Sequence, residues 1–258
     1  MKLQLLPSTF EENGAASPGQ HLTCFLIDDS VAFDAGSLAM ASNARQKQRV
    51  RDIVISHAHL DHIAGLPLFI DDLFATLTEP IRIYAAGEVI EILERDIFNW
   101  SVYPRFSELS NQGSPVLEYR EIEAGARFEV GHLSVLPVGV NHKVPSSGFI
   151  VSDGAATIAL TGDTAATDQF WETVNTESYV SAVLIECAFP NELADLAVIS
   201  HHLTPAGLQK ELSKLRREDC AVYVVNIKPA YRDDTIRQIG CLGIPNLNIL
   251  DVGRVYEW

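Results

Sequence analysis

The stretch His57-Ala58-His59-Leu60-Asp61-His62 decides the fold, because three histidines and a carboxylate directly follow the apolar run at 53–56. Side chains alternate along an extended chain, so His57 and His59 point the same way where the strand ends. Asp61 and His62 follow at a point where a helix can begin, and they reach a second position nearby. Imidazole nitrogens and carboxylate oxygens are ligands that Zn²⁺ takes. The hexapeptide therefore predicts two adjacent metal positions.

A polar, histidine-rich surface turn is the alternative interpretation of this stretch. Three of the chain's eight histidines fall within these six residues, which argues against that alternative. The motif is also far more specific than a lone pair of histidines would be. Metal binding is therefore the interpretation that the sequence favours.

The hexapeptide resembles the HxHxDH signature of the metallo-β-lactamase superfamily. Its continuation, "HAHLDHIAGLPL", is most similar to the class II cyclic-nucleotide phosphodiesterases within that superfamily. Further segments resemble the superfamily in the expected order: "VAFDAGSLA" (31–39), "VNHKVPSSGFIV" (140–151), "ALTGDTAATDQFW" (159–171), "SHHLTP" (200–205) and "NIKPAYRD" (226–233). The resemblance implies an α/β (α+β) fold, a four-layer αββα sandwich of two mixed β-sheets flanked by helices, formed by a single domain over residues 1–258.

The resemblance also implies roles for individual residues. His57, His59 and His142 are expected to hold one metal, whereas Asp61 and His62 are expected to hold a second. Asp163, in "TGDT", is expected to bridge the two metals. Two divalent ions are implied, with zinc expected and manganese or iron as alternatives.

Asn226 departs from the superfamily pattern, which usually has a histidine before the "IKP"-type segment as the last ligand of the second metal. An asparagine offers only an amide oxygen, which suits harder ions better than zinc. Three explanations stay open: a loosely held second metal, completion of the site by His201 or water, and a preference for ions such as Mn²⁺.

The substrate-binding candidates lie in the same segments. His202 is expected to contact the scissile phosphate, although the assignment could be exchanged with His201. Ser146 and Ser147 follow His142 closely enough to bond a phosphate or a base, and a polar turn is the alternative interpretation. Lys228 and Tyr231 are further candidates to contact a phosphate. Asp34 is expected to fix a turn or to orient a ligand and not to bind metal.

Charge narrows the choice among phosphodiesterases. Lys and Arg number 19 against 34 Asp and Glu, which gives a net charge of −15. A protein that grips a nucleic-acid polymer neutralises several phosphates with basic side chains, and a strongly negative field opposes such binding. A small nucleotide still binds a metal site, because the ions supply the local positive charge.

Location and assembly follow from simpler features. No apolar run approaches the ~20 residues of a membrane span, so no membrane association is expected. Four scattered cysteines, without any CxxC pair, predict reduced core thiols: Cys24, Cys187, Cys220 and Cys241. A cytoplasmic location is the default expectation, and a homodimer is compatible with such a domain.

The periodicity of the chain predicts strands and helices in two similar halves. Strands are expected at 2–6, 22–34, 53–56, 81–86, 127–130, 132–139, 182–188 and 220–227, with a hairpin at 148–162 turning at Asp153-Gly154. Helices are expected from Pro67, over 88–100, around 167–174 and from Thr204-Pro205 to Arg217. The stretch after residue 100, up to Ser114, is expected to be a loop, and 220–227 is expected to be the last core strand.

Together these features predict a metal-dependent phosphodiesterase. By resemblance, it hydrolyses a 3′,5′-cyclic nucleotide (cAMP, cGMP or both) to the 5′-nucleotide through a metal-bound hydroxide, with Asp61 and His202 as catalytic residues. The alternatives are another hydrolase on the same scaffold (tRNA 3′-end nuclease, lactonase or thioesterase) and a non-catalytic nucleotide-binding regulator. The charge of −15 weighs against the nuclease, and only Asn226 motivates the regulator.

Overall fold

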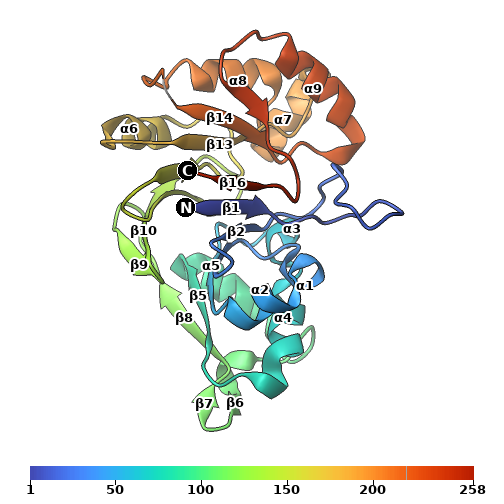
Figure 1. Cartoon of the computed structure of the whole chain (residues 1–258), viewed down its shortest axis with the longest axis vertical. Helices are drawn as coiled ribbons and strands as arrows, with labels where there is room; N and C mark the ends of the chain where they lie inside the picture. The colour runs from blue at the N-terminus through green and yellow to red at the C-terminus, as the bar shows by residue number, and fades with distance from the viewer. Residues whose placement is uncertain (219) are drawn as a thin grey trace. The chain divides into compact units, whose positions relative to one another are not determined.

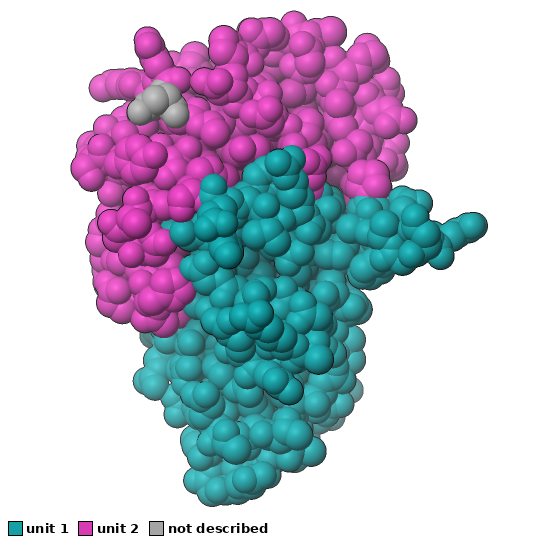
Figure 2. Space-filling model, viewed as in Figure 1, with its two compact units in different colours: residues 1–17, 22–123, 252–257 teal, residues 18–21, 124–251, 258 magenta. Residues whose placement is uncertain are grey.

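The structure is a computed structural model that describes residues 1–218 and 220–258. The chain divides into two compact units, coloured separately in Figure 2. Unit 1 comprises Met1–Ser17, Leu22–Glu123 and Val252–Glu257, and unit 2 comprises Pro18–His21, Ala124–Asp251 and Trp258. The prediction of a single domain over 1–258 stays a prediction.

Unit 1 is built on a seven-stranded mixed sheet with the order β16-β1-β2-β3-β4-β5-β8 (Figure 1). Its strands are β1 (Lys2–Leu5), β2 (Phe25–Ile27), β3 (Val31–Phe33), β4 (Asp52–Val54), β5 (Ile81–Ala85), β8 (Leu117–Glu121) and β16 (Val255–Glu257). The pairs from β16 to β3 are antiparallel. The pairs from β3 to β8 are parallel.

Helices make the crossovers between the parallel strands of unit 1, as parallel pairing requires. They are α1 (Leu38–Ala41), α2 (Ala44–Arg49), α3 (Leu60–Ile63), α4 (Leu66–Leu73) and α5 (Gly87–Ile92), which continues as a π-helical turn over Leu93–Ile97. Phe69 and Ile70 of α4 share one buried cluster with Ile53 of β4 and Ile83 of β5. This packing holds the ends of the parallel strands, and the loops that leave them, in fixed positions.

Unit 2 contains the second seven-stranded mixed sheet, with the order β15-β14-β13-β12-β11-β10-β9. Its strands are β9 (Phe128–Val130), β10 (Leu133–Gly139), β11 (Ser147–Ser152), β12 (Thr157–Leu160), β13 (Ala182–Glu186), β14 (Ala221–Val225) and β15 (Leu247–Ile249). The pairs from β9 to β12 are antiparallel. The pairs from β12 to β15 are parallel.

The crossovers of unit 2 are again helical: α6 (Asp168–Thr176), α7 (Ala194–Ser200), α8 (Pro205–Leu212) and α9 (Arg232–Gly240). Trp171 of α6 and Leu208 of α8 share a buried cluster with Val183 of β13 and Val224 of β14. Thr204 caps α8 as predicted, because its hydroxyl accepts a hydrogen bond from Gly207 N at 3.4 Å, and Pro205 occupies the first turn.

Several boundaries differ from the predictions. The expected strand at 22–34 is two strands, β2 and β3, joined by a turn in which Asp28 and Asp29 both have positive φ (49° and 56°). Aspartate tolerates this left-handed conformation better than most residues, so the acidic pair was an overlooked hairpin signal. The stretch predicted as a loop carries the short hairpin β6 (Ser110–Asn111) and β7 (Ser114–Pro115).

The last part of the chain contains more helices and strands than the sequence analysis predicted. The strand at 220–227 is not the last of its sheet, because α9 and β15 follow it. Cys241 lies just after α9 and is exposed, so its prediction as a core thiol was wrong, whereas Cys24, Cys187 and Cys220 are buried. Within residues 1–218 and 220–258, none of the helices combines the length and the apolarity that crossing a bilayer requires.

Candidate metal centre

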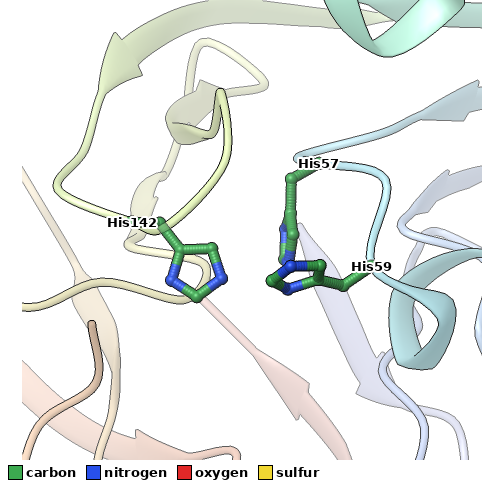
Figure 3. A group of neighbouring side chains, drawn as sticks. All are labelled: His57, His59 and His142. Atoms are coloured by element: carbon green, nitrogen blue, oxygen red, sulfur yellow. The ribbon is translucent and has the colours of Figure 1, made fainter. Parts of the chain in front are cut away.

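The predicted ligand loop of unit 1 leaves the carboxyl end of β4 and enters α3. The ring centroids of His57 and His59 lie 4.7 Å apart, and those of His57 and His62 lie 4.1 Å apart. Figure 3 shows His57 and His59 on this loop; His142, also drawn there, belongs to unit 2. His59 is the N-cap residue of α3, so Asp61 and His62 lie within this four-residue helix. The loop therefore gathers three imidazoles, as the sequence predicted.

The carboxylate of Asp34, which directly follows β3, fixes the conformation of this loop through hydrogen bonds. Its buried carboxylate accepts hydrogen bonds from Ser56 N at 2.8 Å, from Ser56 Oγ at 2.9 Å and from His62 Nδ1 at 2.7 Å. Ser56 Oγ also lies 2.9 Å from His57 Nδ1. Asp34 therefore orients two of the histidines, which is the orienting role expected from the sequence.

These contacts select the ring nitrogen that each histidine presents. A carboxylate only accepts, so His62 Nδ1 carries the hydrogen and the lone pair of the neutral ring is on Nε2. Because the Ser56 hydroxyl donates to Asp34, His57 Nδ1 donates in turn to Ser56 Oγ. Metal-binding histidines in proteins are commonly oriented through such a bond from the other nitrogen.

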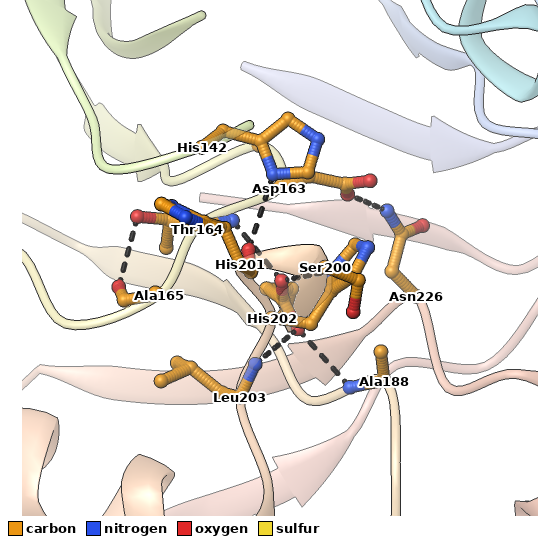
Figure 4. A network of polar contacts seen from close by, with 12 residues as sticks. His142, Asp163, Thr164, Ala165, Ala188, Ser200, His201, His202, Leu203 and Asn226 are labelled. Atoms are coloured by element: carbon orange, nitrogen blue, oxygen red, sulfur yellow. Dashed lines mark hydrogen bonds and ion pairs between the residues drawn. The ribbon is translucent and has the colours of Figure 1, made fainter. Parts of the chain in front are cut away.

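Unit 2 brings its own donors together at one edge of its sheet, around residues that follow β10 and β12 (Figure 4). His142 Nδ1 donates to the backbone carbonyl of His201 at 3.1 Å, which again leaves Nε2 with the lone pair. A ligand atom from each of His142, Asp163 and His202 lies within 4.8 Å of the others. Asp163 is almost fully buried, so this triad offers carboxylate oxygens and two imidazole nitrogens in a confined space.

Asn226 follows β14 with a positive φ of 56° and directs its side chain to Asp163. Its Nδ2 donates a short hydrogen bond to Asp163 Oδ1. This bond turns the amide nitrogen, which is not a metal ligand, toward the carboxylate. The prediction that Asn226 binds metal through its amide oxygen is not tested by this contact and stays a prediction.

Glu186, the last residue of β13, is a functional candidate that the sequence analysis missed. Its fully buried carboxylate accepts hydrogen bonds from Thr164 N at 3.0 Å, Ala188 N at 3.0 Å, Leu203 N at 3.2 Å and His202 Nδ1 at 2.6 Å. The signal was a single acid at the end of the apolar run "AVLIE", which is a costly position for a charge unless it has several donors.

The Glu186 carboxylate sets the state of His202. Burial lowers the pKa of His202, but the charge of Glu186 and its hydrogen bond act in the opposite direction, and the pKa is raised overall. Burial has the opposite effect on the carboxyl group of Glu186, whose pKa it raises, because burial disfavours the charged form. His202 therefore has its Nδ1–H fixed on Glu186, and its Nε2 is the atom available for other partners.

The remaining candidates occupy the surrounding turns. His201 is the left-handed C-cap of α7, and its ring bonds Asn141 Oδ1 at 3.0 Å, so it positions His142 through its carbonyl. Ser147 begins β11 and is buried. Ser146 Oγ is buried and has no hydrogen-bond partner among residues 1–218 and 220–258. Lys228 precedes the 3₁₀ turn at Pro229–Tyr231.

A family model described as the beta-lactamase superfamily domain matches residues 23–223 of the chain, which include both donor sets. The chain belongs to this superfamily. Among solved structures, it is similar to the metallo-beta-lactamase fold protein YhfI from Bacillus subtilis, with a TM-score of 0.72 and 16% identity over 99% of each chain. It is also similar to unliganded yeast PDE1, with a TM-score of 0.77 and 16% identity over 98% of each chain. The predicted metallo-β-lactamase fold is therefore confirmed.

Two curated relatives of the chain are named for different activities. The chain is 29% identical over 213 residues to a probable 3′,5′-cyclic-nucleotide phosphodiesterase of Yersinia pestis, covering 72% of this chain and 59% of the relative. It is 30% identical over 137 residues to a nuclear ribonuclease Z of Triticum aestivum, covering 52% of this chain and 71% of the relative. The chain thus spans little more than half the length of the Yersinia protein.

Proposed function

We propose that the protein is a metal-dependent phosphodiesterase that hydrolyses a 3′,5′-cyclic nucleotide to the 5′-nucleotide. The observation that carries the proposal is that buried carboxylates or backbone carbonyls hold the Nδ1 atoms of His62, His142 and His202, so that each Nε2 is presented. The similarity to the Yersinia protein, whose name specifies this substrate class, supports the choice of reaction.

The donor sets fit divalent metal ions. Imidazole nitrogens with buried carboxylates are a borderline set that suits Zn²⁺, and carboxylate-rich positions also suit Mn²⁺. We assign His57, His59 and His142 to one ion, and Asp61 and His62 to a second. In this assignment Asp163 would supply its carboxylate to the ions, and Asn226 holds that carboxylate in place through Nδ2.

When bound, such ions lower the pKa of a coordinated water to about 7 and offset the charge that develops on phosphorus. The residues of the chain supply the proton that the leaving group needs. In the proposed hydrolysis a hydroxide would form the new P–O bond as the bond from phosphorus to O3′ breaks. His202, protonated on Nε2 because Nδ1–H is fixed on Glu186, gives its proton to O3′.

Phosphate binding is assigned to the turns around the donors. We assign Ser146 Oγ, which is buried without a partner in the described parts of the chain, as a donor to a phosphate oxygen. Ser147, at the start of β11, and Lys228, before the 3₁₀ turn, are the other assigned phosphate contacts. The net charge of −15 favours a small nucleotide over a polymer, since polymer binding depends on several Lys/Arg–phosphate contacts.

A nuclease is the second candidate function, and the similarity to the wheat ribonuclease Z is the observation that favours it. The two candidates use the same donor residues and the same leaving-group chemistry. A nuclease binds several phosphates of its substrate besides the one that reacts, whereas a cyclic-nucleotide phosphodiesterase binds none. The salt dependence of substrate binding therefore distinguishes the two candidates.

The test is a substrate screen with purified protein loaded with Zn²⁺ or Mn²⁺. Cyclic AMP, cyclic GMP, bis(p-nitrophenyl) phosphate and a precursor tRNA are compared at several salt concentrations, with a chelator-treated sample as the control. We expect hydrolysis of a cyclic nucleotide that chelation abolishes and that falls only mildly with salt. Cleavage confined to RNA, with a steep loss of binding as salt rises, would establish the nuclease instead.

A further inference from the structure

Two aromatic side chains of unit 2, Phe189 and Tyr231, form a strip next to His202. The ring of Phe189 meets the His202 imidazole edge-on, with centroids 5.7 Å apart. The ring of Tyr231 lies 5.9 Å from that of Phe189, tilted by 55°. Phe189 therefore contacts both the imidazole that the proposed reaction uses and the ring of Tyr231.

The two rings differ in exposure. Phe189 is 8% exposed and packs in a small cluster with Ala188, Ala197 and Leu193. Tyr231 is 37% exposed, so it keeps a free aromatic surface at the outer end of the strip. The strip thus has a buried inner ring that supports an accessible outer one.

Backbone hydrogen bonds fix this arrangement in place. The turn after β14 is tied to the turn after β13 by Lys228 N, which donates to Ala188 O at 3.1 Å. Tyr231 N donates to Lys228 O at 3.0 Å, and the Thr235 hydroxyl donates to Tyr231 O at 2.9 Å. A surface that is already rigid loses little conformational freedom when a flat ligand binds.

We propose that Tyr231 is the stacking surface for the base of the substrate nucleotide, with Phe189 as its support. The inference rests on the proposed function, because a phosphate held beside His202 fixes where the rest of the nucleotide extends. Two ring contacts, of 5.7 and 5.9 Å between centroids, link His202 to Tyr231 through Phe189. The inference gives Tyr231 a role in selecting an aromatic group, in place of the phosphate contact expected from the sequence.

The charge distribution around the strip supports this orientation. Lys228 lies close enough to His202 for its charge to act on that imidazole, so a positive charge is available near the proposed phosphate position. The outer end carries the uncharged aromatic face of Tyr231. A nucleotide has the matching polarity, with its phosphate at one end and its π face at the other, and base–aromatic stacking tolerates any base.

The test compares the binding of adenosine 5′-monophosphate with that of ribose 5-phosphate, which lacks the base, to the zinc-loaded protein. Calorimetry measures both affinities for wild type, Tyr231→Ala, Tyr231→Leu and Tyr231→Phe. Stacking contributes roughly 1–3 kcal/mol per base, so wild type is expected to prefer the nucleotide by about 5- to 150-fold. Tyr231→Phe is expected to keep that preference, whereas Tyr231→Ala and Tyr231→Leu lose most of it.

Tyr179→Ala is the matched control. Tyr179 is a tyrosine of comparable exposure, 52%, that lies before β13 and thus at the opposite end of the strand from Phe189. It is expected to leave both affinities unchanged. Tyr231→Leu keeps the apolar packing on Phe189, so a Leu variant that retains the preference would overturn the stacking role and leave Tyr231 a packing residue. Failure of wild type to prefer the nucleotide overturns it as well.

The outcomes separate this inference from the function on which it rests. Base-dependent binding without hydrolysis of any cyclic nucleotide contradicts the proposed reaction and retains the stacking surface. Normal hydrolysis with the same nucleotide preference in Tyr231→Ala and wild type contradicts only the stacking surface. The thermal midpoint of each variant confirms that the folded protein is being compared.

Discussion

The two units of this chain build the same kind of sheet and use it differently. In unit 1 three antiparallel pairs, from β16 to β3, continue into three parallel pairs, from β3 to β8. Unit 2 repeats that pattern from β9 through β12 to β15. In both units most of the polar side chains lie in loops beyond the carboxyl ends of strands, which is where loops in such sheets converge. The scaffold is shared, and the difference lies in the loops.

Unit 1 concentrates its donors in one loop, residues 57–62, whereas unit 2 draws His142, Asp163, His202 and Asn226 from four connections. Each unit also contains one buried carboxylate that fixes a histidine: Asp34 holds His62, and Glu186 holds His202. In our assignment both units contribute metal ligands, whereas the proton donor His202 and the substrate contacts come from unit 2 alone.

The largest expected effect comes from removing one donor in each unit. His59→Ala and His142→Ala are each expected to lower phosphodiester hydrolysis on the order of 10³-fold, since the bound ions supply several kcal/mol of charge stabilisation. Because we assign both residues to one ion, the double variant is expected to be no worse than the poorer single variant. Elemental analysis and hydrolysis assays measure both quantities.

A multiplicative loss in the double variant would contradict the assignment to one ion. It would mean that the donors of unit 1 and those of unit 2 act independently. His132→Ala is a suitable control, because it replaces another histidine of unit 2, which precedes β10 and lies outside the proposed ligands. Its metal content and activity are expected to match wild type.

The two buried carboxylates give the next test. Asp34→Asn is expected to weaken metal binding about 10- to 100-fold, because partners of ligating histidines commonly have effects of that size. Glu186→Gln is expected to retain the metal and to lower kcat for a cyclic nucleotide about 10²-fold, because a general acid contributes roughly 10²- to 10⁴-fold. Metal titration and steady-state kinetics separate the two variants.

Leaving-group dependence sharpens this contrast. A nitrophenolate needs little protonation, so Glu186→Gln and His202→Ala are expected to lose much less activity on bis(p-nitrophenyl) phosphate than on a cyclic nucleotide. Equal losses on both substrates would show that Glu186 supports metal binding, as Asp34 does, and not proton transfer. The assignment of the proton donor to unit 2 would then be wrong.

The fold was predictable because its decisive signals are local. The ligand loop follows an apolar strand, Thr204-Pro205 starts α8, and Asp153-Gly154 turns the hairpin between β11 and β12. Features that depend on the partner strand were not predictable. β16 pairs with β1 across almost the whole chain length, and its three residues alternate without an apolar run of their own.

The residues of the candidate site show the same difference between local sequence signals and contacts that form only on folding. The donors of unit 1 are contiguous in sequence, and a motif of six residues was enough to find them. Glu186 has no polar neighbour in sequence, and its role arises from donors at Thr164, Ala188 and Leu203, which only folding brings together. Asp34 was placed correctly because its turn follows a strand, but its bonds to Ser56 and His62 required the structure.

A smaller effect is expected from the glycine that supports the ligand loop of unit 1. A Cβ on Gly36 would lie 2.0 Å from the backbone oxygen of Asp61, and Thr23 N donates to that same oxygen at 2.8 Å. Gly36→Ala must displace the backbone of the loop, and overpacking of this kind costs about 1–3 kcal/mol. We expect a matching loss in the free energy of unfolding, measured by denaturant titration, together with weaker metal binding.

The matched control for Gly36→Ala lies in unit 2. A Cβ on Gly240, at the end of α9, meets no atom within 4 Å. Gly240→Ala is expected to leave stability unchanged or to raise it by up to about 1 kcal/mol, because alanine is the better helix former. Equal destabilisation by both substitutions would show that the contact of Gly36 with the ligand loop is not what constrains it.

The smallest expected effect concerns Asn226, the residue of unit 2 that departs from the superfamily pattern. Asn226→Gly tolerates the positive φ of 56° and removes the hydrogen bond to Asp163, so metal affinity is expected to fall about 10-fold. Asn226→His adds a ring nitrogen and is expected to shift activation by Zn²⁺ to lower concentrations, despite roughly 1–2 kcal/mol of backbone strain. Titrating metal-free protein with Zn²⁺ and Mn²⁺ while following hydrolysis measures both shifts.

A single activation curve shared by wild type and both variants would place Asn226 outside the coordination sphere and would show that its bond to Asp163 does not orient a ligand.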